Sequence, residues 1–240
     1  MIVINNPNNP SGAIIPKSIL LQIADVARKH GAILFSDEVY SPLYHSTSSN
    51  DGDQPTPPSA LALGYERTVV TGSMSKAWAL AGIRLGWLAS RDRTIIEATA
   101  SARDYTTISV SQLDDQVAAY ALSDDVRPNL LARNLALART NLALVDAFIA
   151  AHPTACEWVR PQAGTTGFVR FRGRDGSPVD DVVFCADLLA STKVMLVPGS
   201  KCFGNGKDFR GYVRFGYVCE TDVLERALEQ LSSYVKEHLV

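Results

Sequence analysis

The chain has 240 residues, of which 46% are apolar and 20% charged, and its formal net charge is -2 at pH 7. This composition is ordinary for a globular protein, and so small a net charge gives no reason to expect nucleic acid or an anionic membrane as partner. No apolar run approaches the length of a membrane span, and the cysteines and histidines are scattered. We therefore expect a cytoplasmic protein with reduced thiols and without a metal centre.

A buried strand is predicted over residues 1–4, and a turn rich in asparagine and proline follows at residues 5–12. This turn can hold the amide of Asn9 at the carboxyl end of the strand, which is where ligands bind in open parallel sheets. Taken alone, the segment is equally consistent with a plain loop. Pro16 then begins a helix that closes at Gly31.

The next buried strand covers residues 32–36, and Asp37 follows at its carboxyl end. A carboxylate at this place can face a ligand, and Tyr40 points to the same area if the chain turns helically. The alternative is that Asp37 caps a helix. Residues 42–58 predict a polar surface loop, in which we expect His45 to be exposed and without a role.

A third buried strand, residues 68–70, leads into a run of small residues that includes Ser73. One lysine, Lys76, follows, and one arginine, Arg84, lies eight residues after the lysine. The surroundings of Lys76 are otherwise apolar. Loss of hydration lowers the pKa of such a lysine, so that more free amine is present to form a Schiff base with a carbonyl compound. The alternative is a lysine at a helix start whose amine reaches solvent.

Residues 87–90 predict a further strand and residues 94–103 a helix. A hydroxyl-rich, β-branched segment at 106–111 precedes a long helical region over residues 114–151, which is interrupted at Pro128. Because so long a helix commonly joins two domains, we expect a domain boundary along it.

Beyond Pro153 the pattern changes to strands separated by glycine and charged turns. Arg214 lies in an alternating strand, on the opposite side from Val213 and Phe215. The expected elements are strands at 167–171, 194–197 and 212–217, helices at 179–190 and 221–235, and a glycine-flanked loop at 198–204.

Four motifs, in this order and at these separations, resemble those of fold-type I pyridoxal-phosphate enzymes in the class I and II aminotransferase family. They are residues 8–12 (NNPSG), 37–40 (DEVY), 73–84 (which begin with SMSK and end with Arg84) and 212–216 (YVRFG). The resemblance runs from residue 1 to about residue 238. Any single motif is weak, whereas four in register are difficult to attribute to chance.

The resemblance implies an α/β fold with a mostly parallel, three-layer large domain, present here incompletely, and a small C-terminal α+β domain. Residues 1–125 would form the partial cofactor-binding domain, residues 126–155 an interdomain helix and residues 156–240 the small domain. Loop 198–204 resembles a segment near the site entrance of the family, which would bring Cys202 and Phe203 close to substrate.

The resemblance also implies roles for individual residues around pyridoxal 5'-phosphate. Lys76 would hold the cofactor as an internal aldimine and then move the Cα proton, while Asp37 would keep the pyridine nitrogen protonated. Asn9 and Tyr40 would bind the ring hydroxyl, and Arg214 the substrate carboxylate as a two-pronged fork, with Asn9 beside it. The phosphate would be held by Ser73, Ser75 and Arg84.

Members of the family carry a substantial stretch upstream of the Asn-Pro motif, and this chain begins at the strand leading into that motif. The resemblance therefore implies an N-terminally truncated enzyme that lacks strands, a phosphate-binding helix start and much of the dimer interface. We expect the full-length form to be a homodimer, and the chain by itself to bind the cofactor weakly or not at all.

The function that the resemblance implies is transamination of an L-amino acid with a 2-oxo acid. One alternative is oxidation, hydroxylation or cyclisation of arginine, because residues 103–115 are similar to aminotransferase-like enzymes that carry out such reactions. Another is a catalytically silent fragment that only associates with a partner chain. A short-chain dehydrogenase is disfavoured, since no glycine-rich turn between a strand and a helix is present.

Overall fold

The computed structural model of the protein describes residues 1–45 and 56–240, and the described chain divides into two compact units. The chain passes between the units several times, so neither unit is one continuous segment. Unit 1 consists of Met1–Asn8, Ala13–Leu135 and Gln162–Gly164. Unit 2 consists of Asn9–Gly12, Ala136–Pro161 and Thr165–Val240.

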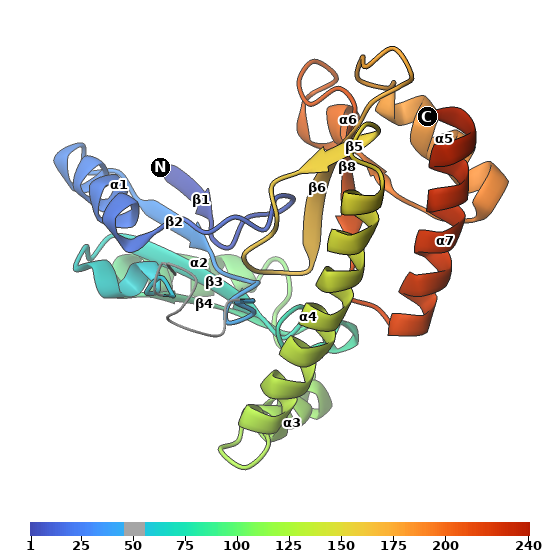
Figure 1. The fold of residues 1–240 in the computed structure, drawn as a ribbon. Helices are drawn as coiled ribbons and strands as arrows, with labels where there is room; N and C mark the ends of the chain where they lie inside the picture. The colour runs from blue at the N-terminus through green and yellow to red at the C-terminus, as the bar shows by residue number, and fades with distance from the viewer. Residues whose placement is uncertain (46–55) are drawn as a thin grey trace. The chain divides into compact units, whose positions relative to one another are not determined.

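Unit 1 is built on a four-stranded sheet of order β1-β2-β3-β4 (Figure 1). The strands are β1 (Ile2–Asn5), β2 (Leu34–Asp37), β3 (Thr68–Ser73) and β4 (Gly86–Ser90). The first three are parallel and β4 is antiparallel to β3. The register places Asn5, Asp37 and Thr71 side by side at the carboxyl ends of the parallel strands. The polar residues that follow these strands therefore gather at one edge of the sheet.

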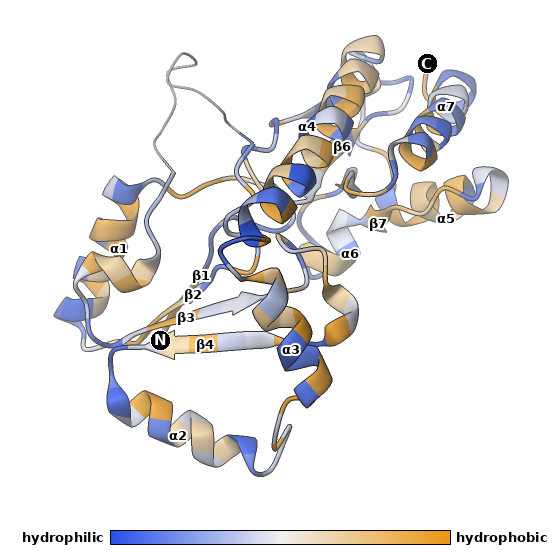
Figure 2. Cartoon of the chain, turned by 90° about the horizontal axis from the view of Figure 1, so that it is seen from below, coloured by the Kyte–Doolittle hydropathy of each residue, from blue (hydrophilic) through white to orange (hydrophobic). Residues whose placement is uncertain are grey.

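The sheet of unit 1 packs against one face of an amphipathic helix. Helix α1 (Lys17–Lys29) buries Leu20, Ala24 and Ala27 against Leu34 and Val70, and Figure 2 shows its polar residues on the other side. Among the described residues, the other helical segments of this unit are η1 (Ala60–Leu63), η2 (Ala81–Ile83), α2 (Arg93–Arg103), α3 (Gln112–Ala121) and the first part of α4 (Arg127–Ala151), up to Leu135.

Unit 2 contains a second four-stranded sheet, of order β5-β6-β8-β7, in which all pairings are antiparallel. Its strands are β5 (Cys156–Trp158), β6 (Thr166–Phe171), β7 (Val197–Pro198) and β8 (Tyr212–Gly216). Alternate residues such as Val169 and Val213 point into a core shared with the helices, and Phe168 and Arg214 are paired on the other face. The helices are α5 (Asp181–Thr192), α6 (Gly199–Phe203) and α7 (Thr221–His238), together with part of α4 (Arg127–Ala151).

The helical region expected over residues 114–151 is two helices, so the expectation of one interrupted helix was wrong. Helix α3 ends at Ala121 and α4 begins at Arg127, whose amide donates to Ser123. Pro128 does not break α4, because it lies in the first turn, where a missing amide proton costs nothing. The division between the two units falls inside α4, after Leu135, rather than at its ends.

Helix α4 is long and apolar enough to cross a membrane by length and composition alone, although no apolar run of that length was expected. A buried core helix passes the same test, and residues such as Leu142, Val145 and Phe148 belong to the core of unit 2. Packing therefore accounts for part of the apolar character of α4, in which 33% of the apolar window is buried.

Three smaller expectations also differ from the structure. The strand expected over 194–197 is only Val197–Pro198, and the loop expected over 198–204 contains α6. His45 is buried rather than exposed, because residues 43–45 are bonded through their backbone to residues 162–164. Residues 46–55 of the expected surface loop lie outside the described residues.

Candidate active site

Asp37 ends strand β2, and two donors fix its carboxylate. The hydroxyl of Thr71, its neighbour on β3, donates to Oδ1 across 3.2 Å, and the amide of Val39 donates to the same oxygen across 3.3 Å. Within residues 1–45 and 56–240, the second oxygen has no hydrogen-bond partner. The carboxylate is half-buried and oriented, with one oxygen available to a cationic or N–H donor.

Tyr40 and Lys76 come together in unit 1. The Tyr40 ring is buried, and Lys76 Nζ lies 5.9 Å from its centroid. Gly164 lies against the same side chain, since a Cβ at position 164 would lie 3.4 Å from Tyr40 Cδ1. The positive φ of Gly164, 81°, also favours glycine. The aromatic ring is thus a rigid surface beside the lysine amine.

Ser73 ends β3, and the connection from β3 to β4 begins with Met74, Ser75 and Lys76. Ser73 Oγ accepts a hydrogen bond from the Ser75 amide across 3.0 Å and lies 2.9 Å from the Ser75 hydroxyl. The Met74 amide donates to the carbonyl of Leu85, which draws the end of the connection back to its start. The two serine hydroxyls are therefore held together at the start of this connection, and the backbone of Leu85, the residue after Arg84, is bonded back to the same place.

Lys76 is exposed, so of the two alternatives that the sequence left open, the structure shows an amine that reaches solvent. Its neighbours Met74, Ala77 and Trp78 take the buried positions and leave the lysine pointing outward. The carbonyl of Ala77 accepts a hydrogen bond of 2.9 Å from Asn134, a buried residue of α4. The backbone that carries the amine is thus fixed, although burial does not desolvate the amine itself.

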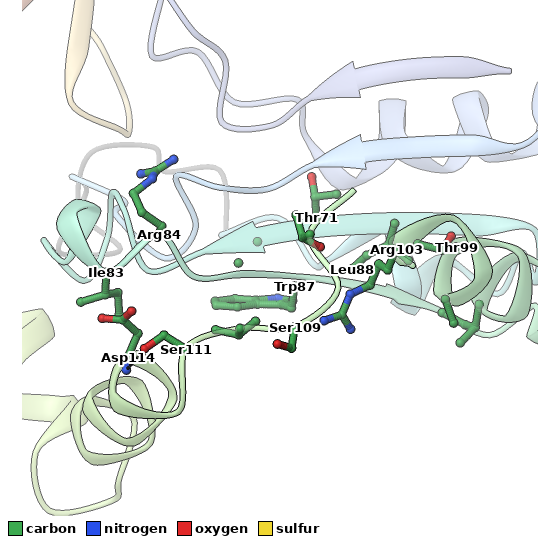
Figure 3. A pocket seen from close by; sticks show the side chains of 16 residues that line it. Thr71, Ile83, Arg84, Trp87, Leu88, Thr99, Arg103, Ser109, Ser111 and Asp114 are labelled. Atoms are coloured by element: carbon green, nitrogen blue, oxygen red, sulfur yellow. Dashed lines mark hydrogen bonds between the residues drawn. The ribbon is translucent and has the colours of Figure 1, made fainter. Parts of the chain in front are cut away.

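Arg84 lies in the left-handed region with a φ of 53° and ends η2. Its Nη1 donates to the carbonyl of Ala81 across 2.8 Å, and the side chain is exposed. Figure 3 shows it extending away from Trp87 and Asp114. A left-handed conformation is rare for a residue other than glycine, so the turn holds Arg84 in a defined orientation.

Asn9 and Arg214 come together in unit 2. Nη1 of Arg214 donates to Oδ1 of Asn9 across 3.4 Å, although the two residues are 205 positions apart in the chain. The guanidinium carbon lies 5.5 Å from the centroid of the Phe203 ring, which is close enough for a cation–π contact. Arg214 is half-buried, as expected for an anion-binding arginine set against an aromatic surface.

The candidate residues therefore form two groups, one in each unit. Sequence reasoning missed Thr71 and Asn134. The first has a usable signal, because pairing the two predicted parallel strands places a hydroxyl beside Asp37. The second has none, since an asparagine inside an apolar helix does not reveal which carbonyl it contacts.

A hollow of about 830 Å³ lies on unit 1, between β3, β4, α2 and residues 107–111. Figure 3 shows Trp87, Arg103 and Ser109 around it. Thr71 and Arg84 contribute to its lining, but Asp37, Tyr40 and Lys76 do not. We therefore place the candidate site by its polar residues and not by this hollow.

The donor set in unit 1 fits pyridoxal phosphate in its chemistry. An available amine matches an aldehyde, and an oriented carboxylate with one unpartnered oxygen matches a pyridine nitrogen. The two bonded serine hydroxyls and the arginine of the same connection match a phosphate in their chemistry.

Comparison with known proteins gives an independent indication. The family model for aminotransferase class I and II matches residues 1–231. The chain is 31% identical to capreomycidine synthase of Streptomyces vinaceus over 99% of this chain, and 30% identical to aromatic-amino-acid aminotransferase 2 of Thermococcus litoralis over 98%. A crystal structure of a PLP-dependent aminotransferase from Streptococcus suis superimposes with a TM-score of 0.85 and 34% identity over 99% of this chain.

The chain spans little more than half the length of these relatives. It covers 56% of the capreomycidine synthase and 57% of both aminotransferases.

Proposed function

This chain belongs to the class I and II aminotransferase family, and we propose that it carries the lysine-bearing part of a site that transaminates an L-amino acid with a 2-oxo acid. The cofactor of this family is pyridoxal phosphate. The observation that carries the proposal is the placement of Lys76 Nζ over the buried ring of Tyr40. Tyr40 itself follows the oriented carboxylate of Asp37 by three residues.

Pyridoxal phosphate supplies an aldehyde that condenses with amines and a ring that accepts electron density. Lys76 would hold the cofactor at its aldehyde carbon and would move a proton at the substrate Cα. Asp37 holds a proton at the pyridine nitrogen, because a carboxylate stabilises an adjacent cation. Tyr40 and Asn9 are assigned to the ring hydroxyl.

Ser73, Ser75 and Arg84 are assigned to the phosphate. Their support is that Ser73 and Ser75 are bonded to each other at the end of β3 and that Arg84 lies at the other end of the same connection, held by its bond to Ala81. Charge-assisted hydrogen bonds from arginine are stronger than neutral ones. A lysine at position 84 would supply a point charge without the planar fork.

Arg214 is assigned to the substrate α-carboxylate. One of its nitrogens is bonded to Asn9, and the ring of Phe203 supports the guanidinium plane, so its remaining N–H groups are pre-oriented. Losing a charge-assisted contact of this kind costs about 2–3 kcal/mol. We assign unit 2 as the small C-terminal domain that supplies this contact.

A second candidate function is cyclisation, oxidation or hydroxylation of arginine. The similarity to capreomycidine synthase favours it, because that relative is not named an aminotransferase. Half-reaction spectra with a panel of amino acids separate the two functions. Conversion of an amino acid, arginine included, to its 2-oxo acid with the cofactor left as its amine supports transamination, whereas consumption of oxygen or a product of arginine that keeps its α-amino nitrogen contradicts it.

Partners and location form a further part of the proposal. Amino acids and 2-oxo acids are the proposed substrates, and the complete enzyme is proposed to be a cytoplasmic homodimer. A third reading, a silent chain that only associates with a partner, predicts no covalent reaction with the cofactor at all.

Borohydride trapping tests the central assignment. The 240-residue chain is incubated with excess pyridoxal phosphate, reduced and mapped by peptide mass spectrometry, which detects even weak binding. We expect the pyridoxyl group on Lys76 and its loss in Lys76→Ala. Lys201→Ala, which removes an exposed lysine of unit 2, serves as the control and should keep the label on Lys76. Equal labelling of all exposed lysines would contradict the proposal.

A further inference from the structure

Asp181 is a buried carboxylate outside the residues assigned above. It opens α5 and is 1% exposed, whereas its neighbour Asp180 is exposed and caps the helix through the amides of Val182 and Val183. Because helix capping is done by Asp180, the burial of a second acid at this position has another cause. Buried carboxylates are retained only when their oxygens are well bonded.

Both oxygens of Asp181 bind the segment of residues 199–211. Oδ2 accepts from the amide of Ser200 across 2.9 Å and from its hydroxyl across 2.7 Å. Oδ1 accepts from the amide of Gly211 across 3.1 Å. One side chain therefore joins the start of the segment to its end.

The segment closed by Asp181 is tightly fitted. Gly211 has a φ of 79°, and a Cβ there would lie 2.8 Å from Pro178. A Cβ on Gly204 would lie 2.1 Å from the carbonyl oxygen of Asp208. Gly206 and Asp208 also donate within the segment, to Ser200 and Gly204. Such a segment adopts one conformation as long as its ends stay joined.

The closed segment presents two aromatic rings to the face of the sheet that carries Arg214. Phe203 and Phe209 both pack edge-on against Phe168, with centroids 5.8 Å and 5.4 Å away. Phe168 is the cross-strand partner of Arg214, and Phe203 lies against the guanidinium. The position of Arg214 therefore depends on a ring that is carried by the clamped segment.

We propose that Asp181 is a positioning residue for the carboxylate site: by clamping residues 199–211 it keeps Phe203 against Arg214. The inference rests on the proposed function of Arg214. The segment contains Lys201, Lys207 and Arg210, yet Asp181 forms no ion pair with any described residue and bonds to a serine and a glycine instead. The carboxylate oxygens of Asp181 thus bond to the backbone amides of Ser200 and Gly211, which fixes the two ends of the segment.

The first experiment measures the clamp in the full 240-residue chain. In Asp181→Asn an amide replaces one acceptor oxygen, so a donor faces a donor. We expect trypsin to cleave at Lys201, Lys207 and Arg210 about tenfold to a hundredfold faster than in the wild type, because the open form becomes more populated. Asp180→Asn, the adjacent acid on the same helix, is the matched control and should leave cleavage within about twofold. Equal cleavage of Asp181→Asn and wild type would overturn the proposal.

The second experiment reports on Arg214 directly. The Nε–H resonance of Arg214 is assigned by its loss in Arg214→Lys, and we expect its position to change in Asp181→Asn. We expect a change also in Phe203→Leu, which removes the ring, while the segment of residues 199–211 in this variant should resist trypsin as in the wild type. Asp180→Asn should not move it. An unchanged Arg214 resonance in Asp181→Asn would show a purely structural role for this acid and would overturn the proposal.

Titration with pyruvate separates this inference from the proposed function. We expect pyruvate to shift the wild-type Arg214 resonance, and its dissociation constant to rise about tenfold in Asp181→Asn. Equal constants in both proteins would overturn the role of Asp181 alone. No response in the wild type would overturn the assignment of Arg214 to carboxylates, and with it the part of Asp181 in that site.

Discussion

The hydroxyl of Thr71 on β3 donates to Oδ1 of Asp37 on β2, its partner in the parallel register. In Thr71→Val the carboxylate loses this donor, worth about 1 kcal/mol, which corresponds to about a fivefold weaker binding of pyridoxal phosphate. Absorbance titration measures the affinity, and urea unfolding shows whether stability also changes. Thr71→Ser keeps the hydroxyl and should bind as the wild type does; a loss of affinity equal to that of Thr71→Val would contradict the role of this bond.

Asn134 holds the carbonyl of Ala77, the residue after Lys76, from inside α4. Asn134→Ala leaves this buried carbonyl without its donor, so we expect the free energy of unfolding to fall by about 1–3 kcal/mol. Urea denaturation measures the change. Asn129→Ala, an exposed position on the same helix, is the control and should change stability by less than about 0.5 kcal/mol. Equal stability of the two variants would show that the bond contributes nothing.

Gly72 lies under the indole of Trp87, its cross-strand partner. A Cβ at this position would lie 2.4 Å from Trp87 Cε2, so Gly72→Ala must displace the ring, at a cost of about 1–3 kcal/mol. Gly82→Ala is the matched control, because a Cβ at Gly82 meets nothing within 4 Å. Stability is measured by urea unfolding. If the clash is the cause, the cost disappears when Trp87→Ala is combined with Gly72→Ala, and persistence of the cost would refute this explanation.

His152 is buried, and its Nε2 lies 2.8 Å from the hydroxyl of Ser232. Burial, together with the charge of Lys236, lowers the pKa of His152 below its usual value of 6.5. The unfolded chain therefore binds more protons than the folded chain as pH falls through 6.5, so stability declines there and the decline ends below the lowered folded pKa. Urea unfolding between pH 8 and pH 4 should show a smaller decline in His152→Gln than in the wild type. An identical pH dependence in both proteins would contradict the assignment.

The motifs were predictable from sequence because each requires particular residue types beside a strand end. Asp37, Ser73 and Lys76 follow buried runs of apolar, partly β-branched residues, and the structure places strands β2 and β3 there. The pairing of Asn9 with Arg214 was expected only through the family resemblance, because nothing local links residues 205 positions apart.

The elements that sequence reasoning missed depend on tertiary contacts in all but one case. The break after Ala121 does have a local signal, because the polar residues 123–125 (Ser-Asp-Asp) interrupt the apolar pattern shortly before Pro128, and the expectation of one helix gave this signal too little weight. The exposure of Lys76 follows from its neighbours filling the buried positions, which a list of apolar residues cannot show. Likewise His45 is buried by bonds to a segment more than one hundred residues away.

The interleaving of the two units limits how the protein can be dissected. The turn that carries Asn9 belongs to unit 2, although residues on both sides of it belong to unit 1, and residues 162–164 return to unit 1 from the other direction. Dividing the chain within α4 therefore yields two fragments that each lack a short segment of their own unit, residues 162–164 in the first and residues 9–12 in the second. Neither is a sound starting point for expressing one unit alone, and graft or fusion designs should instead respect all of these chain crossings.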